Sequence, residues 1–221
     1  MKDVAASPWS TPATVAGFAT ASPNLTLIDH AAAQLGRTHS AHLLDIGCGA
    51  GRNAVPLARM GWNVAGTDLS RPMLQAAAAR EGGHRLHLVN APMHALPIRG
   101  AAIDFIVAHG IWNLARSGGE FRQAVSEAAR VAKPGAALFV FTFSRNTLPA
   151  TAEPVDGETF VFTQFSGAPQ CFLTGPQLLA ELRSAGFAPD PTLPLRELNR
   201  PGPGLRTTGA PVIYEGAFRF S

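Results

Sequence analysis

Residues 43–53 read Leu-Leu-Asp-Ile-Gly-Cys-Gly-Ala-Gly-Arg-Asn, and this stretch decides the fold. An apolar strand runs into three glycines at alternate positions, Gly47, Gly49 and Gly51, and then into a helical segment. Glycine tolerates positive φ and lets a ligand approach the backbone closely. The start of the next helix presents free N–H groups and the positive end of its dipole to a negative group. The stretch therefore predicts a strand, turn and helix that together bind a ligand.

Strand-like and helical segments alternate through the middle of the chain. Such alternation indicates βαβ units and a parallel sheet. The nearly all-apolar run Ile103 to Ala108 is typical of a central parallel strand. The expected strands are 42–46, 62–67, 85–90, 103–108 and 136–143, and the expected helices are 52–60, 70–80 and 119–132.

The two ends of the chain differ from this pattern. Residues 1–40 contain two helix starts, at Thr11-Pro12 and Pro23-Asn24, and are predicted to form a helical cap separate from the sheet. After residue 144 we expect a strand-like run at 159–165, a helix at 174–185, and strands at 192–198 and 212–220. No helix separates the last two strands, which are therefore expected to be antiparallel.

Composition excludes several classes of protein. The chain has 221 residues, 46% of them hydrophobic, and a net charge of 18 − 15 = +3. A sizeable core is therefore possible, and disorder of the whole chain is excluded. The basic residues form no block, which argues against nucleic-acid binding. No apolar run reaches the roughly 18 to 20 residues of a membrane span, and Met1-Lys2-Asp3-Val4 lacks the apolar run of a secretory signal.

Cysteine usage predicts a reducing compartment. The two cysteines, Cys48 and Cys171, cannot build a disulfide framework, and neither has a CxxC partner for a structural zinc site. The histidines show no metal-ligand spacing on a shared helix face, so we expect no metal. The cytoplasm is the expected location.

An acidic residue completes the glycine pattern. Asp68 ends the next expected strand, about twenty residues on, where a carboxylate can accept hydrogen bonds from both hydroxyls of a ribose. Residues 49–54 also match the GxGxxA variant of a dinucleotide fingerprint. Three features favour S-adenosylmethionine over a dinucleotide: Asp45 before the glycines, their GxGxG spacing, and the antiparallel end of the sheet.

The chain resembles the class I S-adenosylmethionine-dependent methyltransferases over residues 40–145. Beyond the D-x-G-x-G-x-G core, the resemblance rests on Leu96-Pro97-Ile98, the segment 103–107 and Arg130-Val131-Ala132-Lys133-Pro134-Gly135. Cys171 to Phe187 is similar to the family's late helix and the turn after it. The resemblance implies a Rossmann-like α/β fold. Its seven-stranded mixed sheet is parallel except for an antiparallel last strand, with helices on both faces and a helical lid over residues 1–40; the catalytic domain would span 41–221.

The resemblance also implies a set of cofactor contacts. Asp45 and the first glycines would hold the methionine part, Asp68 the ribose, and Leu69 would pack on adenine. Met93 would offer its backbone N–H to adenine, whereas Pro92 stands where the family often has an aspartate and can neither accept nor donate there. The expected cofactor-binding residues are Asp45, Gly47, Cys48, Gly49, Asp68, Leu69, Pro92, Met93, His109 and Gly110. Cys48 has a competing role as a small residue in tight backbone space.

His109, just past the fourth expected strand, is the candidate catalytic residue. Methyl transfer is an in-line displacement that depends mainly on positioning, and a base is needed only when the nucleophile carries a proton. A loop histidine of which only the backbone matters is the competing interpretation. The candidate substrate-contacting residues are Trp9, Phe18, Arg52, Trp112, Phe162 and Phe165, each of which has ordinary packing or an exposed surface position as its alternative.

These observations predict an enzyme that moves a methyl group from S-adenosylmethionine to a small-molecule acceptor, leaving S-adenosylhomocysteine. Nucleic acid and membranes are not expected partners, and the oligomeric state is left open. The Gly51-Arg52-Asn53 ending is similar to the tellurite-resistance and thiol methyltransferase branch, so a small thiol, tellurite or selenite acceptor is one alternative. The others are a nicotinamide-dependent reductase and a cofactor-binding protein that transfers no methyl group.

Overall fold

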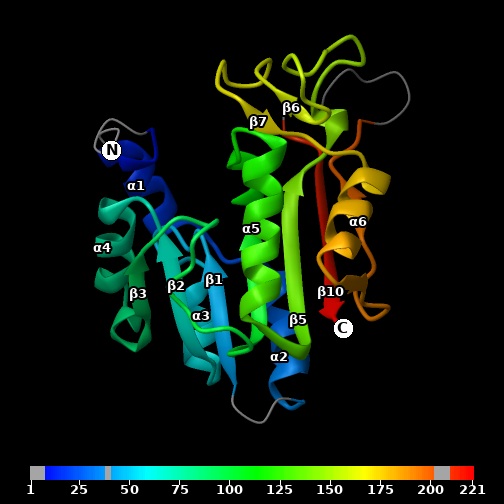
Figure 1. The fold of residues 1–221 in the computed structure, drawn as a ribbon. Coiled ribbons are helices and arrows are strands. Elements are labelled where there is room, and N and C mark those ends of the chain that lie inside the picture. Colours follow the sequence, from blue (N-terminus) through cyan, green and yellow to red (C-terminus); the bar gives the residue numbers. More distant parts are fainter. Residues whose placement is uncertain (1–7, 38–40, 202–209) are drawn as a thin grey trace.

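The computed structural model describes residues 8–37, 41–201 and 210–221, which build a mixed sheet between two layers of helices. The strand order is β3-β2-β1-β4-β5-β10-β8, with β9 also paired to β10. The first five strands are parallel and β10 is antiparallel to β5 (Figure 1). The strand bounds are β1 His42–Ile46, β2 Asn63–Asp68, β3 His87–Asn90, β4 Ile103–His109, β5 Ala132–Phe143, β8 Phe187–Pro189, β9 Arg196–Leu198 and β10 Ile213–Phe220.

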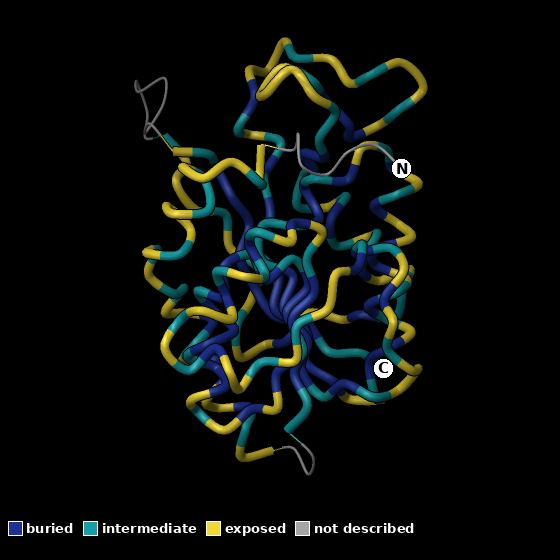
Figure 2. Tube along the Cα trace, turned by 90° about the vertical axis from the view of Figure 1, so that its left-hand side faces the viewer, coloured by how far each residue is buried: buried dark blue, intermediate teal, exposed yellow. Residues whose placement is uncertain are grey.

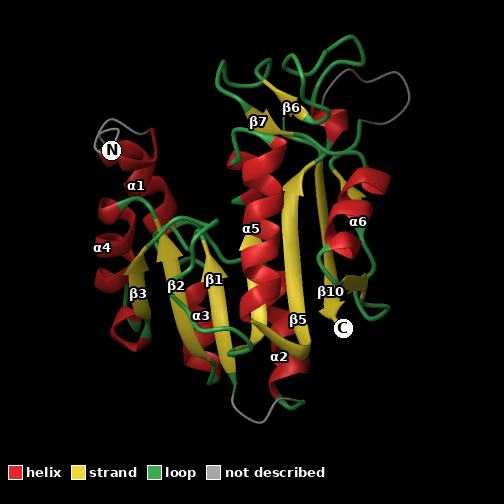
Figure 3. Cartoon of the chain, viewed as in Figure 1, coloured by secondary structure: helices red, strands yellow, loops and turns green. Residues whose placement is uncertain are grey.

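Each face of the sheet is covered by its own helices (Figure 3). Helices α5 (Gly118–Val131) and α6 (Gly175–Ser184) pack with Leu138 and Val140 on one face. Helices α2 (Leu25–Leu35) and α3 (Ala54–Met60) pack with Phe139 on the other. Side chains alternate between the faces along a strand, so β5 serves both layers. The strands at the centre are the most deeply buried part of the chain (Figure 2).

The predicted Rossmann-like α/β fold is confirmed, with one refinement in the strand count. Strands β8 and β9 pair with opposite ends of β10, β8 with residues 218–220 and β9 with residues 213–215. Both strands therefore lie beside β10 at the same edge of the sheet. The sheet has the seven predicted strand positions but contains eight strands, because β8 and β9 occupy one position. The break between β8 and β9 lies against Gly216, where an added Cβ would come within 2.7 Å of the Leu195 backbone.

The first forty residues divide into two parts with different roles. Thr11 caps α1 (Pro12–Thr20) and Asn24 caps α2, as the predicted helix starts require. Helix α1 buries no residue and lies against α4 (Arg71–Ala79), whereas Leu27 and Ala31 of α2 belong to the core. Among the described residues of this segment, α1 and the short turn at Pro8–Ser10 lie outside the sheet's helical layers, whereas α2 belongs to one of them.

A cover of loops lies above the carboxyl ends of the parallel strands (Figure 1). It contains the short antiparallel pair β6 (Val161–Phe162) and β7 (Gln170–Cys171), shorter than the strand expected over 159–165. Its aromatic side chains form a small satellite cluster in which Phe162 and Phe172 pack with Leu148 and Phe143. Most of the segment between the expected strands 192–198 and 212–220 lies outside the described residues.

Candidate active site

The glycine turn after β1 has the backbone conformation that its sequence predicts. Gly47, Gly49 and Gly51 have φ values of 69°, 52° and 74°. An added Cβ on Gly47 would lie 2.6 Å from the Ile111 side chain, so this position also needs glycine for space. The Cys48 N–H donates to the Thr67 carbonyl at 2.9 Å, which ties the turn to the end of β2. Backbone geometry therefore places the turn at the carboxyl edge of the sheet.

Asp68 joins the two chain segments that frame this edge. Its carboxylate accepts the Gly49 N–H at 2.9 Å and the Ser70 N–H at 2.8 Å. Asn90, at the end of β3, donates to the carbonyls of Asp68 and Leu69. Burial raises the Asp68 pKa, against the lowering effect of these N–H donors. The carboxylate is thus held between the glycine turn and the start of α4.

Asp45 is a buried carboxyl group without a hydrogen-bond partner among the described residues. Only 2% of the residue is exposed, and burial together with nearby Asp68 raises its pKa to about 7, with Arg52 opposing the shift. A charged group in such a place is costly unless it is paired. A cationic ligand group at the glycine turn would pair it.

Cys48 packs instead of reacting. Its sulfur lies 2.8 Å from where a Cβ on Gly66 of β2 would stand, so Gly66 makes the space that the thiol fills. The residue is 6% exposed, and burial raises its pKa well above the usual value, so the thiolate is disfavoured. These observations favour the structural role that the sequence left open.

The remaining predicted cofactor residues line the same edge at different depths. Leu69 is 52% exposed, Pro92 is half-buried, and Met93 is buried in the core cluster. Gly110 follows β4 with a φ of 70°, and an added Cβ would meet nothing within 4 Å. The Leu69 side chain is free to cover a flat ligand group, as its predicted role requires.

His109, at the end of β4, lies in a polar cluster. Its ring stacks on Phe141 of β5 with centroids 4.1 Å apart. A terminal nitrogen of Arg52 lies 3.2 Å from Nδ1 and 3.3 Å from Nε2, and Asn24 Nδ2 lies 3.2 Å from Nε2. Burial and the Arg52 charge lower the His109 pKa to about 3. The neutral ring is therefore the form present near pH 7.

The candidate substrate residues differ in their contacts and in how exposed they are. Trp9 and Phe18 contact each other edge to face on the outer helical segments, and Phe18 lies 3.9 Å from an ideal Cβ on Gly49. Arg52 reaches His109, and Phe165 is 45% exposed beside Phe143.

Trp112 and Phe162, the other two candidates, are buried. Trp112 is fully buried against Phe121, and Phe162 is 3% exposed in the satellite cluster. The structure does not bring either side chain to the exposed edge, because each fills a core.

The sequence interpretation missed two residues of the cluster around His109. Asn24 was identified only as a helix start, and Glu215 was identified only as part of a strand. Asn24 Nδ2 donates to Glu215 Oε2 at 2.7 Å, across 191 positions of chain. No local pattern signals such a pair, although a glutamate in the last strand, where apolar residues are expected, is a weak hint.

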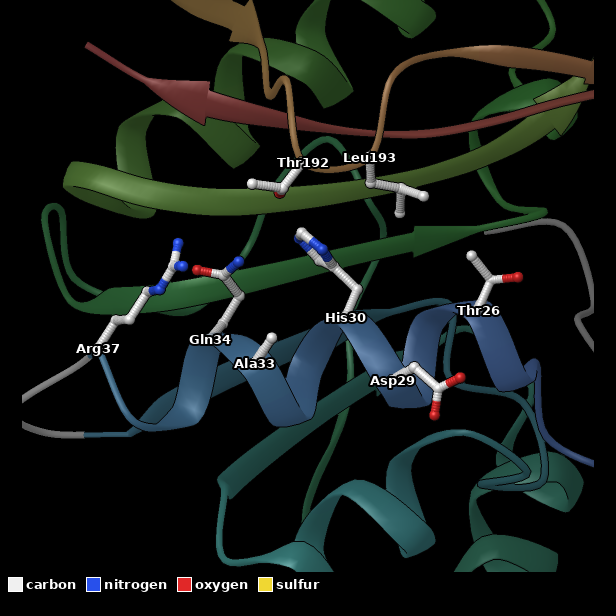
Figure 4. Close-up of a pocket in the computed structure, with 8 residues that line it drawn as sticks. All are labelled: Thr26, Asp29, His30, Ala33, Gln34, Arg37, Thr192 and Leu193. Carbon is white, nitrogen blue, oxygen red and sulfur yellow. The ribbon is translucent and has the colours of Figure 1, made fainter.

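A pocket of about 330 Å³ lies elsewhere, between α2 and the loop after β8 (Figure 4). His30 points into this region, and its Nε2 has no hydrogen-bond partner among residues 8–37, 41–201 and 210–221. None of the predicted site residues lines the pocket. Within the described ranges, no cluster of histidine, cysteine or acidic side chains could hold a metal, and no helix there is long and apolar enough to cross a membrane.

Comparison with known proteins finds similar methyltransferases. Residues 44–140 match the family model described as a methyltransferase domain. Over 110 residues the chain is 36% identical to malonyl-[acyl-carrier protein] O-methyltransferase of Salmonella typhimurium, a match that covers 49% of this chain and 41% of the relative. It is 34% identical over 122 residues to ubiquinone biosynthesis O-methyltransferase of Caulobacter vibrioides, covering 54% and 47%. These matches support the predicted resemblance to the class I S-adenosylmethionine-dependent methyltransferases. It spans less than half the length of both relatives.

A solved structure shows the same fold around a bound cofactor product. The methyltransferase chain superposes with a TM-score of 0.64 on the 1,6-didemethyltoxoflavin-N1-methyltransferase of Burkholderia thailandensis, solved with 1,6-didemethyltoxoflavin and S-adenosylhomocysteine. The two are 21% identical, and the match covers 88% of this chain and 78% of the other. At this identity the likeness establishes the fold. The match to a methyltransferase domain favours S-adenosylmethionine over a nicotinamide dinucleotide as the ligand of the glycine turn.

Proposed function

We propose that this methyltransferase moves a methyl group from S-adenosylmethionine to a small-molecule acceptor by in-line displacement. The observation that carries the proposal is the pair of carboxylates around the glycine turn. Asp45 is buried without a hydrogen-bond partner in the described part of the chain, and Asp68 holds the turn through Gly49. An amino-acid ammonium group and a ribose match these two carboxylates in charge and hydrogen bonding.

The residues present suit the cofactor as follows. Asp45 would bind the ammonium group, Asp68 the ribose hydroxyls, and the backbone at Gly47 and Gly49 the methionine part. Leu69 would cover adenine, with Pro92 and Met93 at its edge. When bound, the cofactor supplies an electrophilic methyl group on a sulfonium. The protein's own contribution is to align the acceptor with that group and to exclude water.

His109 and Gly110 would line the reactive end. A ring with a pKa of about 3 can accept a hydrogen bond from an acceptor, but it is a poor store for a proton at pH 7. Such a site suits acceptors that are already deprotonated or soft. Arg52, beside His109, would favour an anionic one. This arrangement supports the thiol or metalloid oxyanion as the second candidate acceptor class.

The apolar side of the acceptor site would come from the cover and α1. Phe165 of the cover and Trp9 and Phe18 of the outer helical segments are the exposed aromatic candidates. The names of two relatives specify O-methylation, of malonyl-[acyl-carrier protein] in one and in ubiquinone biosynthesis in the other. We propose the cytoplasm as the location, because both cysteines are free.

An isotope experiment tests the transfer. The protein is incubated with S-adenosylmethionine carrying a heavy methyl group and with thiols, selenite, tellurite, phenols and amines, and mass spectrometry reads headspace and solution. Label in any acceptor, lost in Asp68→Ala, supports the proposal. Label in a volatile product selects the small-nucleophile class.

The non-catalytic alternative predicts a different combination. S-adenosylhomocysteine would bind in calorimetry, while no acceptor of the panel would gain label. For His109→Ala the proposal predicts turnover reduced by about a hundredfold, with affinity for S-adenosylhomocysteine kept within a few-fold. Full turnover in this variant would show that His109 lines the site without contributing to catalysis.

A further inference from the structure

The Asn24 side chain is held in one orientation by three contacts. Its Oδ1 accepts the Leu27 N–H at 3.0 Å, which makes it the N-cap of α2. Its Nδ2 donates to Glu215 Oε2 at 2.7 Å and lies 3.2 Å from His109 Nε2. Because the oxygen is used by the cap, the two amide hydrogens must point to Glu215 and His109.

This orientation determines the state of the His109 ring. Nε2 faces an N–H donor and must carry the lone pair, so the proton of the neutral ring lies on Nδ1. The Arg52 nitrogen lies 3.2 Å from Nδ1 and 3.3 Å from Nε2, so it does not discriminate between the two ring nitrogens. Nε2 faces N–H groups of both Asn24 and Arg52, whereas Nδ1 faces Arg52, so the contact with Asn24 favours the lone pair on Nε2.

Glu215 is placed to hold this arrangement. It stands opposite Phe141 in the β5–β10 ladder, and Phe141 stands opposite His109 in the β4–β5 ladder, so the three side chains form one row across the sheet. Glu215 is 8% exposed, and Asn24 is the donor to its carboxylate. A buried carboxylate makes a short, strong hydrogen bond to such an amide.

We propose that Glu215, acting through Asn24, is a positioning residue that keeps His109 in the Nδ1–H tautomer with its ring fixed on Phe141. The chain of contacts also places the start of α2, next to the outer helix α1, in direct contact with the candidate reaction centre. The effect of this positioning on catalysis rests on the proposed function. The tautomer itself can be measured in the protein without ligands.

The test reads the tautomer directly. Long-range ¹H–¹⁵N spectra of histidine-labelled protein, without cofactor or acceptor, identify His109 by the signals lost in His109→Gln. The wild type should show the Nδ1–H form alone. Glu215→Leu should show both tautomers, and Glu215→Gln should keep the wild-type pattern because its amide oxygen still accepts from Asn24. An unchanged pattern in Glu215→Leu would overturn the proposal.

Two further variants separate positioning from folding. Asn24→Ser keeps an N-cap oxygen for Leu27 and removes the amide donor, so it should also give both tautomers if Glu215→Leu does not fold. Glu197→Leu removes a comparable carboxylate, one bonded to Ser144 and Asn146, and should leave His109 unchanged. A wild-type His109 pattern in Asn24→Ser would contradict the proposal.

Kinetics supply the second measurement. Glu215→Leu should lower kcat by about tenfold to a hundredfold, with KM for S-adenosylmethionine within about twofold of the wild type. Equal changes in Glu197→Leu would contradict the positioning role. Absence of methyl transfer in the wild type would refute the proposed function, and the tautomer spectra would still decide the positioning role.

Discussion

The two halves of the candidate site are built in different ways. Around β1 and β2, main-chain groups do most of the work: glycines with positive φ and an Asp68 carboxylate that accepts two backbone N–H groups. Around β4, β5 and β10, side chains meet side chains from distant segments, as in the Asn24–Glu215 pair. The first half depends on local geometry and the second on long-range packing. A cofactor common to a family suits the first, and an acceptor particular to one enzyme suits the second.

The largest effect is expected at Asp68. Replacing it with alanine removes the acceptor for the Gly49 and Ser70 N–H groups and for the proposed ribose contact. Affinity for S-adenosylhomocysteine in calorimetry should fall by at least about a hundredfold.

Asp104→Ala is the matched control for this prediction. Asp104 pairs with Lys133 on β5, away from the turn, so its loss should lower stability without weakening binding. Equal affinity in wild type and Asp68→Ala would show that the cofactor half is not where we place it.

Gly47→Ala tests the role of the backbone itself. The alanine would adopt a strained φ of 69° with its Cβ 2.6 Å from Ile111, so unfolding free energy should fall by about 2 to 4 kcal/mol. In Gly135→Ala, φ is 78° and nothing lies within 4 Å, so only the conformational cost of about 1 to 2 kcal/mol remains. Urea unfolding compares the two, and equal losses would exclude crowding at Gly47.

The Asp45 carboxyl group should make the stability of the fold depend on pH. Its pKa is raised to about 7 in the folded chain. At pH values above the pKa of the unfolded chain, ionisation of Asp45 therefore lowers the free energy of unfolding, by at most about 4 kcal/mol. The penalty is absent below about pH 4, grows between about pH 4 and pH 7, and is constant above about pH 7. Asp45→Asn should therefore flatten the fall in unfolding free energy between pH 4 and pH 7.

The same ionisation should govern cofactor binding. Affinity for S-adenosylhomocysteine in the wild type should rise by about tenfold per pH unit below pH 7 and then level off, because only the carboxylate pairs with an ammonium group. Calorimetry from pH 5.5 to 8 measures this. A flat profile would remove Asp45 from the ammonium site.

The smallest effect is expected in the cover. Phe165 is 45% exposed, so Phe165→Ala should change unfolding free energy by less than about 1 kcal/mol while raising KM for the acceptor a few-fold. Phe162→Ala, at a buried position, should cost about 3 kcal/mol. A KM change in the second variant alone would move the acceptor contact from the exposed ring to the buried cluster.

Local patterns in the sequence were sufficient for the backbone around the glycine turn. The run from Asp45 to Asn53 predicted a strand, a turn and a helix, and Asp68 was placed at the next strand end, because periodicity and glycine conformation act over a few residues. The family resemblance extended this to the whole sheet, including the antiparallel β10.

Tertiary structure decided what lies around His109. It buried Trp112 and Phe162, which the sequence offered as pocket residues, because a single aromatic residue has no local sign of its burial. It divided the first forty residues, since α2 packs in the core and α1 does not. It also brought Asn24, Arg52 and Glu215 to one histidine. Hydrogen bonds between residues 57 to 191 positions apart depend on how strands and helices pack, and that packing is a property of the whole chain.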